Sequence, residues 1–69
     1  MTQQEIKEFF DWAQHNLRNF EIQECDESNH VYLNDVFIGG WAGDTQKYFI
    51  KQNDETAKAL RMMDAANEA

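Results

Sequence analysis

The sequence has one cysteine, few cationic residues and no long apolar run. Each of these shortages excludes a class of structure or of binding partner. One cysteine in 69 residues excludes an internal disulfide, so the packed core alone must hold the fold. No apolar run approaches the roughly 20 residues that span a bilayer. The acidic, amphipathic start lacks the basic-then-apolar pattern of a signal peptide. We therefore expect a soluble cytoplasmic protein in a reducing compartment.

Cationic residues are fewer than half as numerous as carboxylates. Six Lys and Arg stand against thirteen Asp and Glu, which gives a formal net charge of −7 at pH 7. Such a surface repels DNA, RNA and anionic lipid, so we expect no direct nucleic-acid binding and no membrane contact. It suits a basic protein surface, including one that normally holds nucleic acid. The alternative is that the acidity only supports solubility.

Apolar residues are plentiful enough for a small core. Hydrophobic residues make up 42% of the chain, and the aromatic residues are five Phe, two Tyr and two Trp. This composition is too apolar for a disordered chain. It predicts a single domain over residues 1–69, near the lower size limit for folding without a disulfide or a metal.

Two amphipathic helices are predicted near the ends of the chain. Thr2 and Glu5 have the spacing of a capping box, which predicts a helix over residues 3–18. Its apolar stripe consists of Ile6, Phe9, Phe10, Ala13 and Leu17. Asn53 and Asp54 suit the N-cap of a second helix over residues 55–66. The apolar stripe of that helix is Thr56, Ala59, Leu60 and Met63.

Between the helices the pattern predicts an antiparallel meander. Residues 20–23 alternate between apolar and polar, as in a strand, and residues 26–29 are mostly of types that favour turns. Residues 31–33 and 36–38 form two further strands joined by Asn34 and Asp35, which tolerate a type I′ turn. After a loop over residues 42–45, residues 46–51 form the last strand. The alternative merges residues 30–39 into one bent strand. The expected fold class is α+β, a three- or four-stranded αβββ(β)α arrangement with both helices on one sheet face.

Strict alternation in the simplest registers, with Val31 opposite Ile38 and Trp41 opposite Gln46, sorts the strand side chains into two faces. The face predicted to lie under the helices carries Phe20, Ile22, Val31, Leu33, Val36, Ile38 and Phe49. The opposite face is predicted to carry Tyr32, Phe37, Trp41, Tyr48 and Ile50, with Glu21, Gln23, Cys25 and His30 beside them. An aromatic patch of that kind is typical of a contact surface.

No residue pattern indicates catalysis, a metal or a cofactor. The glycines at 39, 40 and 43 are followed by a predicted strand, whereas a phosphate-binding loop leads into a helix N-terminus. Cys25, Asp26 and His30 are too few for a structural zinc site. Cys25 also lacks a neighbouring cation or helix N-terminus to stabilise a thiolate nucleophile. We therefore expect that the protein is not an enzyme and has no cofactor.

The segment VYLNDVFIGG resembles the closing hairpin of glutaredoxins, over about ten residues of the chain. The catalytic cysteine motif of that family is absent, so the resemblance carries over no site residue. In size, acidity and predicted architecture the chain is similar to small phage-encoded DNA mimics such as anti-CRISPR proteins and glycosylase inhibitors. No motif supports this second likeness, which is an analogy of overall character.

The leading hypothesis is a non-enzymatic inhibitor or adaptor that docks on a basic protein surface. Aromatic side chains would be the desolvated anchors, and carboxylates would take the positions of phosphates. The predicted aromatic contacts are Tyr32, Phe37, Trp41 and Tyr48, with Trp12, which falls outside the apolar stripe of its helix. The predicted acidic contacts are Glu21, Glu24, Asp26, Glu27, Asp35 and Asp44. The alternative hypothesis is a structural homodimer that packs through the aromatic sheet face.

Overall fold

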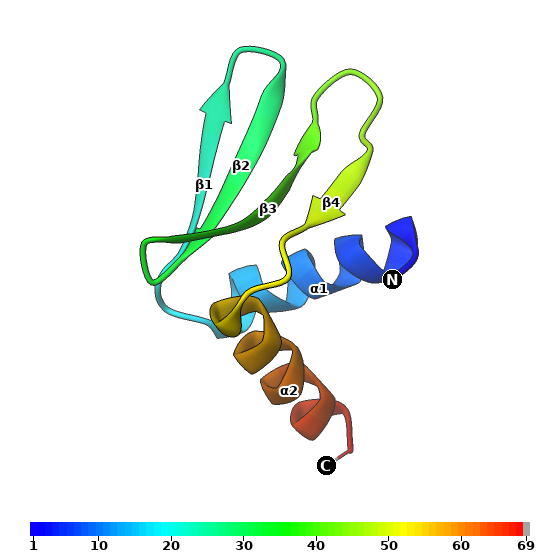
Figure 1. Cartoon of the computed structure of the whole chain (residues 1–69). Coiled ribbons are helices and arrows are strands. Elements are labelled where there is room, and N and C mark those ends of the chain that lie inside the picture. Colours follow the sequence, from blue (N-terminus) through cyan, green and yellow to red (C-terminus); the bar gives the residue numbers. More distant parts are fainter. Residues whose placement is uncertain (69) are drawn as a thin grey trace.

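The chain folds as a helix, a four-stranded antiparallel meander and a second helix. The computed structural model describes residues 1–68; Ala69, the last residue of the predicted domain, lies outside them. The elements are α1 (Gln3–Asn16), β1 (Phe20–Cys25), β2 (Ser28–Leu33), β3 (Val36–Ala42), β4 (Tyr48–Ile50) and α2 (Asp54–Glu68) (Figure 1). The sheet order β1-β2-β3-β4 confirms the predicted α+β class and the predicted four strands; residues 30–39 do not merge into one strand.

The capping box predicted for α1 is present. The backbone N–H of Glu5 donates to Thr2 Oγ1 at 3.1 Å, and the backbone N–H of Thr2 donates to Glu5 Oε1 at 3.0 Å. The hydrogen bonds from the Thr2 backbone and side chain lower the pKa of the Glu5 carboxyl. The helix ends at Asn16, two residues before the predicted end, because Leu17 already has an extended backbone with φ −108° and ψ 132°.

Asn53 caps the N-terminus of α2 and also connects this helix to the sheet. Its Oδ1 accepts the backbone N–H of Thr56 at 2.9 Å, as an N-cap does. Its Nδ2 donates to the backbone oxygen of Phe37 in β3, also at 2.9 Å. One side chain therefore satisfies an otherwise unpaired helix donor and fixes where the helix starts relative to β3.

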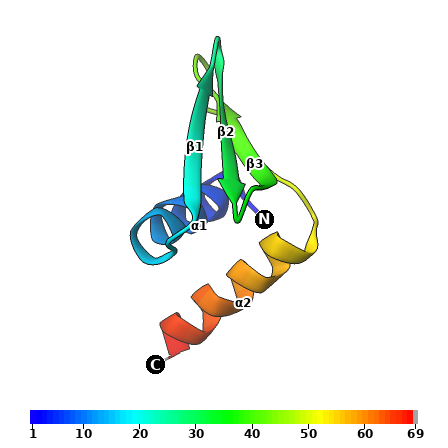
Figure 2. The ribbon, with the colours of Figure 1, turned by 90° about the vertical axis from the view of Figure 1, so that its left-hand side faces the viewer.

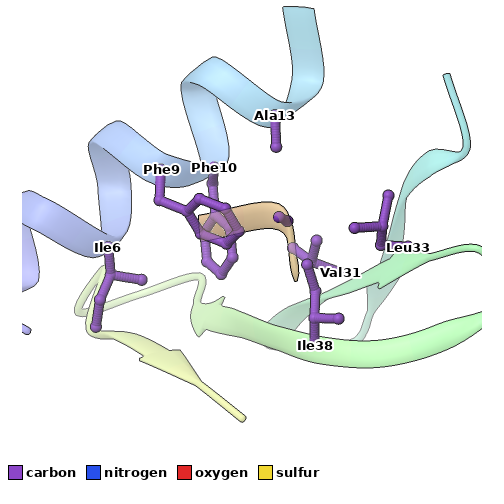
Figure 3. Packing of buried hydrophobic residues seen from close by; sticks show 8 residues of the cluster. Ile6, Phe9, Phe10, Ala13, Val31, Leu33 and Ile38 are labelled. Atoms are coloured by element: carbon purple, nitrogen blue, oxygen red, sulfur yellow. The ribbon is translucent and has the colours of Figure 1, made fainter. Parts of the chain in front are cut away.

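The core lies between α1 and one face of the sheet. Figure 3 shows the α1 side chains directed at those of β2 and β3. The buried apolar residues are Ile6, Phe9, Phe10 and Ala13 of α1, Val31 and Leu33 of β2, Ile38 of β3 and Ala59 of α2. Because residues of both helices belong to this one cluster, both helices cover the same face of the sheet.

Two tight turns set the ends of the first two hairpins. Asn34 and Asp35 have φ values of 52° and 65°, which confirms the type I′ geometry predicted for the β2–β3 turn. Asp26, with φ 42°, and Glu27 alone separate β1 from β2, whereas the predicted turn covered residues 26–29. The β1–β2 hairpin is therefore longer than predicted.

A β-bulge interrupts the pairing of β2 with β3. Tyr32 pairs with Phe37, as predicted, but Val31 pairs with Gly39 rather than with Ile38. One extra residue of β3 therefore stands opposite the Val31–Tyr32 step. Gly39 has φ 151°, a conformation that residues with a side chain rarely adopt. A Cβ at Gly39 would lie 3.1 Å from Phe10 Cζ, so the missing side chain also lets β3 approach α1 closely.

The bulge reverses the face assignment of every residue beyond it. Trp41 and Tyr48, predicted for the open side of the sheet, lie under α1, with ring centroids 6.1 and 6.2 Å from that of Phe10. Ile50, predicted for the same open side, also packs against the core. Phe49, predicted to lie under the helices, is on the opposite side and 40% exposed. The prediction was wrong because it assumed strict alternation along β3.

The β3–β4 loop and the hairpin ends bring smaller corrections. The loop is longer than the predicted residues 42–45, so Trp41 pairs with Tyr48 and not with Gln46. Ile22 and Val36, predicted to be covered by the helices, are each 37% exposed. Ile22 belongs to the β1–β2 hairpin, which extends beyond both helices (Figure 2). Val36 directly follows the β2–β3 turn, as the first residue of β3.

Candidate protein-binding surfaces

The sheet face turned away from the helices carries a cluster of aromatic rings. We call His30, Tyr32, Phe37 and Phe49 the open-face cluster. The centroid of Phe37 is 5.3 Å from that of His30, 5.5 Å from that of Tyr32 and 6.0 Å from that of Phe49. Such separations are those of favourable tilted or edge-to-face aromatic pairs. Phe37 is therefore the centre of a cluster that β2, β3 and β4 build together.

Charged side chains stand at both margins of this cluster. Lys51 Nζ lies 5.6 Å from the centroid of the Phe37 ring, within the range of a cation–π contact. Across the sheet, Glu21 of β1 pairs with Tyr32 of β2 and so shares its face. The open face is thus cationic at its β4 margin and anionic at its β1 margin.

The open-face cluster contains only part of the predicted aromatic contact surface. Tyr32 and Phe37 lie there as predicted, and Trp41 and Tyr48 do not, because they pack under α1. Trp12 is half-buried and packs against the core cluster. Phe49 was missed. The signal that could have found it is the glycine pair at 39 and 40, since paired strand glycines often mark a bulge.

Acidic side chains gather at the end of the sheet furthest from the helices. The β1–β2 turn and the β3–β4 loop both lie at this end (Figure 1), and the Gly43 backbone N–H donates to the Glu27 backbone oxygen at 2.7 Å. This bond joins the two hairpin ends. We call the resulting group the acidic tip; its members are Glu24, Asp26, Glu27 and Asp44. Of the other predicted acidic contacts, Glu21 lies on the open face and Asp35 in the β2–β3 turn at the opposite end.

The residues of the acidic tip are exposed and available for charge interactions. Asp44 Oδ1 accepts only the neighbouring Thr45 N–H, at 2.7 Å, among the hydrogen bonds of residues 1–68. Within those residues no three His, Cys, Asp or Glu side chains are grouped so as to hold a metal ion. The thiol of Cys25, at the end of β1, is free and exposed. The arrangement suits recognition of cationic groups by unpaired carboxylates.

A small hollow lies between the end of α1, the β2–β3 turn and α2. Its volume is about 170 Å³, and Leu17, Leu33 and Ala59 contribute to its apolar lining. Ligand pockets for drug-sized molecules are larger, at roughly 300–1,000 Å³. Asn34 links the elements around the hollow, since its Oδ1 accepts from Asn19 at 2.7 Å and its Nδ2 donates to Glu55 at 3.1 Å. We attribute a structural role to this region.

Among residues 1–68 no helix has the length and apolar character needed to cross a membrane. No family model matches the chain, and no curated protein or solved structure shows significant similarity to it. The acidic tip and the open face are thus the features from which a function can be inferred.

Proposed function

We propose that this protein is a non-enzymatic binding module that docks its acidic tip on a basic surface of a partner protein, as an inhibitor or adaptor. The observation that carries this proposal is the convergence of exposed carboxylates from two separate hairpins at one end of the sheet. Carboxylates gathered in this way create a local negative potential. That potential attracts Lys and Arg side chains and raises the rate of association with a basic surface.

The position of the tip favours this role over a purely solubilising one. The β1–β2 hairpin extends beyond the helices, so its turn reaches a surface that the helical end does not touch (Figure 2). The hydrogen bond between Gly43 and Glu27 fixes one hairpin end against the other. A fixed arrangement of charges loses less conformational entropy on binding than charges on independent loops. Acidity that served solubility alone would need no such arrangement.

The acidic tip is best suited to a partner whose basic surface normally binds nucleic acid. A protein that binds nucleic acid neutralises successive phosphates with Lys and Arg side chains. Carboxylates held together at a projecting end can pair with the same cations. The protein would then compete with nucleic acid for the surface, as a steric and electrostatic inhibitor.

The test compares two triple variants with the same net charge. The tip variant carries Asp26→Asn, Glu27→Gln and Asp44→Asn. The control variant carries Glu8→Gln, Asp11→Asn and Asp64→Asn, all on the helices. Each set removes three of the seven net negative charges, which leaves −4. Asn keeps the positive φ that Asp26 needs, so the turn is preserved.

Immobilised parent and variant chains would first capture proteins from a lysate of the source organism. Association rates with each captured, purified protein would then be measured by surface plasmon resonance at two salt concentrations. We expect the tip variant to associate about tenfold or more slowly than the helix control, and added duplex DNA to displace the partner. Equal slowing in the two variants would mean that only net charge matters. That result would refute the role of the tip.

A further inference from the structure

The open face has an order of side chains that suits a second copy of the same chain. Across the sheet, Glu21 of β1 pairs with Tyr32 of β2, and Tyr32 pairs with Phe37 of β3. Lys51 completes this row, because its Nζ lies over the Phe37 ring and its backbone N–H donates to the Ile38 oxygen at 2.8 Å. The row therefore begins with a negative charge, continues with two aromatic rings and ends with a positive charge.

The neighbouring row adds two more rings to the same face. Gln23 pairs with His30, His30 with Gly40, and Gly40 with Phe49. Gly40 itself leaves no hollow, because a Cβ there would meet the backbone oxygen of Asn29. The His30 and Phe49 rings therefore stand on either side of a β3 position without a side chain, and both pack against Phe37.

In a face-to-face dimer with a two-fold axis parallel to the strands, midway between β2 and β3, each row of one copy faces the same row of the other copy in reverse order. Lys51 of one copy then faces Glu21 of the other, and the Tyr32 ring of one copy faces the Phe37 ring of the other; each contact occurs twice. An in-plane axis perpendicular to the strands would instead oppose like charges. Sheets stack face to face at about 10 Å, a distance that such side chains can bridge. We infer that the chain forms a symmetric homodimer through its open face, with the axis parallel to the strands.

The two-fold axis also determines where the two acidic tips lie in the dimer. An axis parallel to the strands leaves both β1–β2 hairpins pointing the same way, so the two acidic tips lie at one end. Repulsion between two chains of net charge −7 opposes the pairing. The aromatic contact and the two Lys51–Glu21 pairs oppose that repulsion. The dimer does not require a basic partner, because it forms through a different surface.

The experiment measures the dimer dissociation constant by sedimentation at about 0.15 M salt, where charge interactions are screened over roughly 8 Å. The variants are Glu21→Lys, Lys51→Glu, the two changes combined in one chain, and an equal mixture of the single variants. The control is Lys58→Glu, which makes the same charge change at an exposed position of α2. Circular dichroism verifies that each variant is folded, which we expect because both positions are exposed.

We expect each single variant to weaken the dimer about tenfold or more, since like charges then meet twice. The combined variant and the mixture should both restore it, because opposite charges face each other again. Glu21→Lys changes the net charge from −7 to −5, so repulsion alone would make it a tighter dimer than the parent. Three results would overturn the inference: a parent that stays monomeric at millimolar concentration, a mixture that does not recover, or a Lys58→Glu control that weakens the dimer as much as Lys51→Glu.

Discussion

Replacement of Trp41 by Ala tests the face assignment that the bulge imposes. Trp41 is half-buried and forms aromatic pairs with Phe10 at 6.1 Å and with Tyr48 at 5.6 Å. Truncation of a buried Trp or Phe to Ala costs roughly 3–5 kcal/mol. Because Trp41 is only half-buried, we expect the lower end, about 3 kcal/mol. The total stability of a domain of this length is about 3–10 kcal/mol, so this loss is a large part of it.

The matched control is Phe49→Ala, in the strand next to Trp41 but on the open face. Phe49 is 40% exposed, and its aromatic partner is Phe37, at 6.0 Å. We expect its removal to cost about 1 kcal/mol in the monomer, roughly the value of one aromatic pair. Strict alternation predicts the reverse order of the two costs, with Phe49 in the core and Trp41 outside it.

The assay is urea unfolding followed by far-ultraviolet circular dichroism, at a protein concentration low enough for the chain to be monomeric. The midpoint of Trp41→Ala should lie well below that of Phe49→Ala, with similar slopes for both. If Phe49→Ala lowered stability as much as Trp41→Ala, the two residues could not lie on opposite faces. The bulge would then not separate them.

Two further substitutions address the bulge and the capping box. Gly39→Ala should lower the free energy of unfolding by about 2 kcal/mol or more, because φ is 151° and a Cβ would lie 3.0 Å from Ile50 Cα. The control Gly43→Ala, in an exposed loop, should lower it clearly less. An equal loss in urea unfolding of the two variants would contradict the strain at Gly39. Glu5→Gln keeps the capping hydrogen bond but removes the charge. Because folding lowers the pKa of Glu5 below its ordinary value, its charge stabilises the fold above the pKa of the unfolded chain and loses this effect as the pH falls through the folded pKa. The difference in melting temperature between parent and Glu5→Gln should therefore shrink towards zero in acid, and a difference unchanged from pH 7 to pH 2 would contradict it.

Local signals in the sequence determined the elements and their order. The Thr2–Glu5 capping box, the helical spacing of Ile6, Phe9, Phe10 and Ala13, and the Asn34–Asp35 turn each act over a few residues. Capping, amphipathic periodicity and positive-φ turns depend on the residues present and on backbone geometry. The α+β class followed from these elements, because two amphipathic helices and a meander bury their apolar faces most simply against each other.

The identity of the open face was decided by tertiary structure. A bulge changes the face of every later residue, and where it forms depends on what packs against the strand. At Gly39 the nearest neighbours are the backbone atoms of Phe49 and Ile50 in β4, followed by Phe10 of α1, and this close approach selects the residue without a side chain. The glycine pair in the sequence signalled a local irregularity but not which side chains it would turn outward.

The acidic tip shows the same division between local and long-range determinants. The sequence identified Glu24, Asp26, Glu27 and Asp44 as acidic residues near turns, because turn chemistry is local. Their convergence depends on the hydrogen bond between Gly43 and Glu27, which forms only when two hairpins pair side by side in one sheet. Pairing between strands brings together residues that are distant in the chain, and no local pattern encodes that distance. The sequence by itself therefore determined the charge and the elements, and only the assembled sheet decided which charges and which rings share a surface.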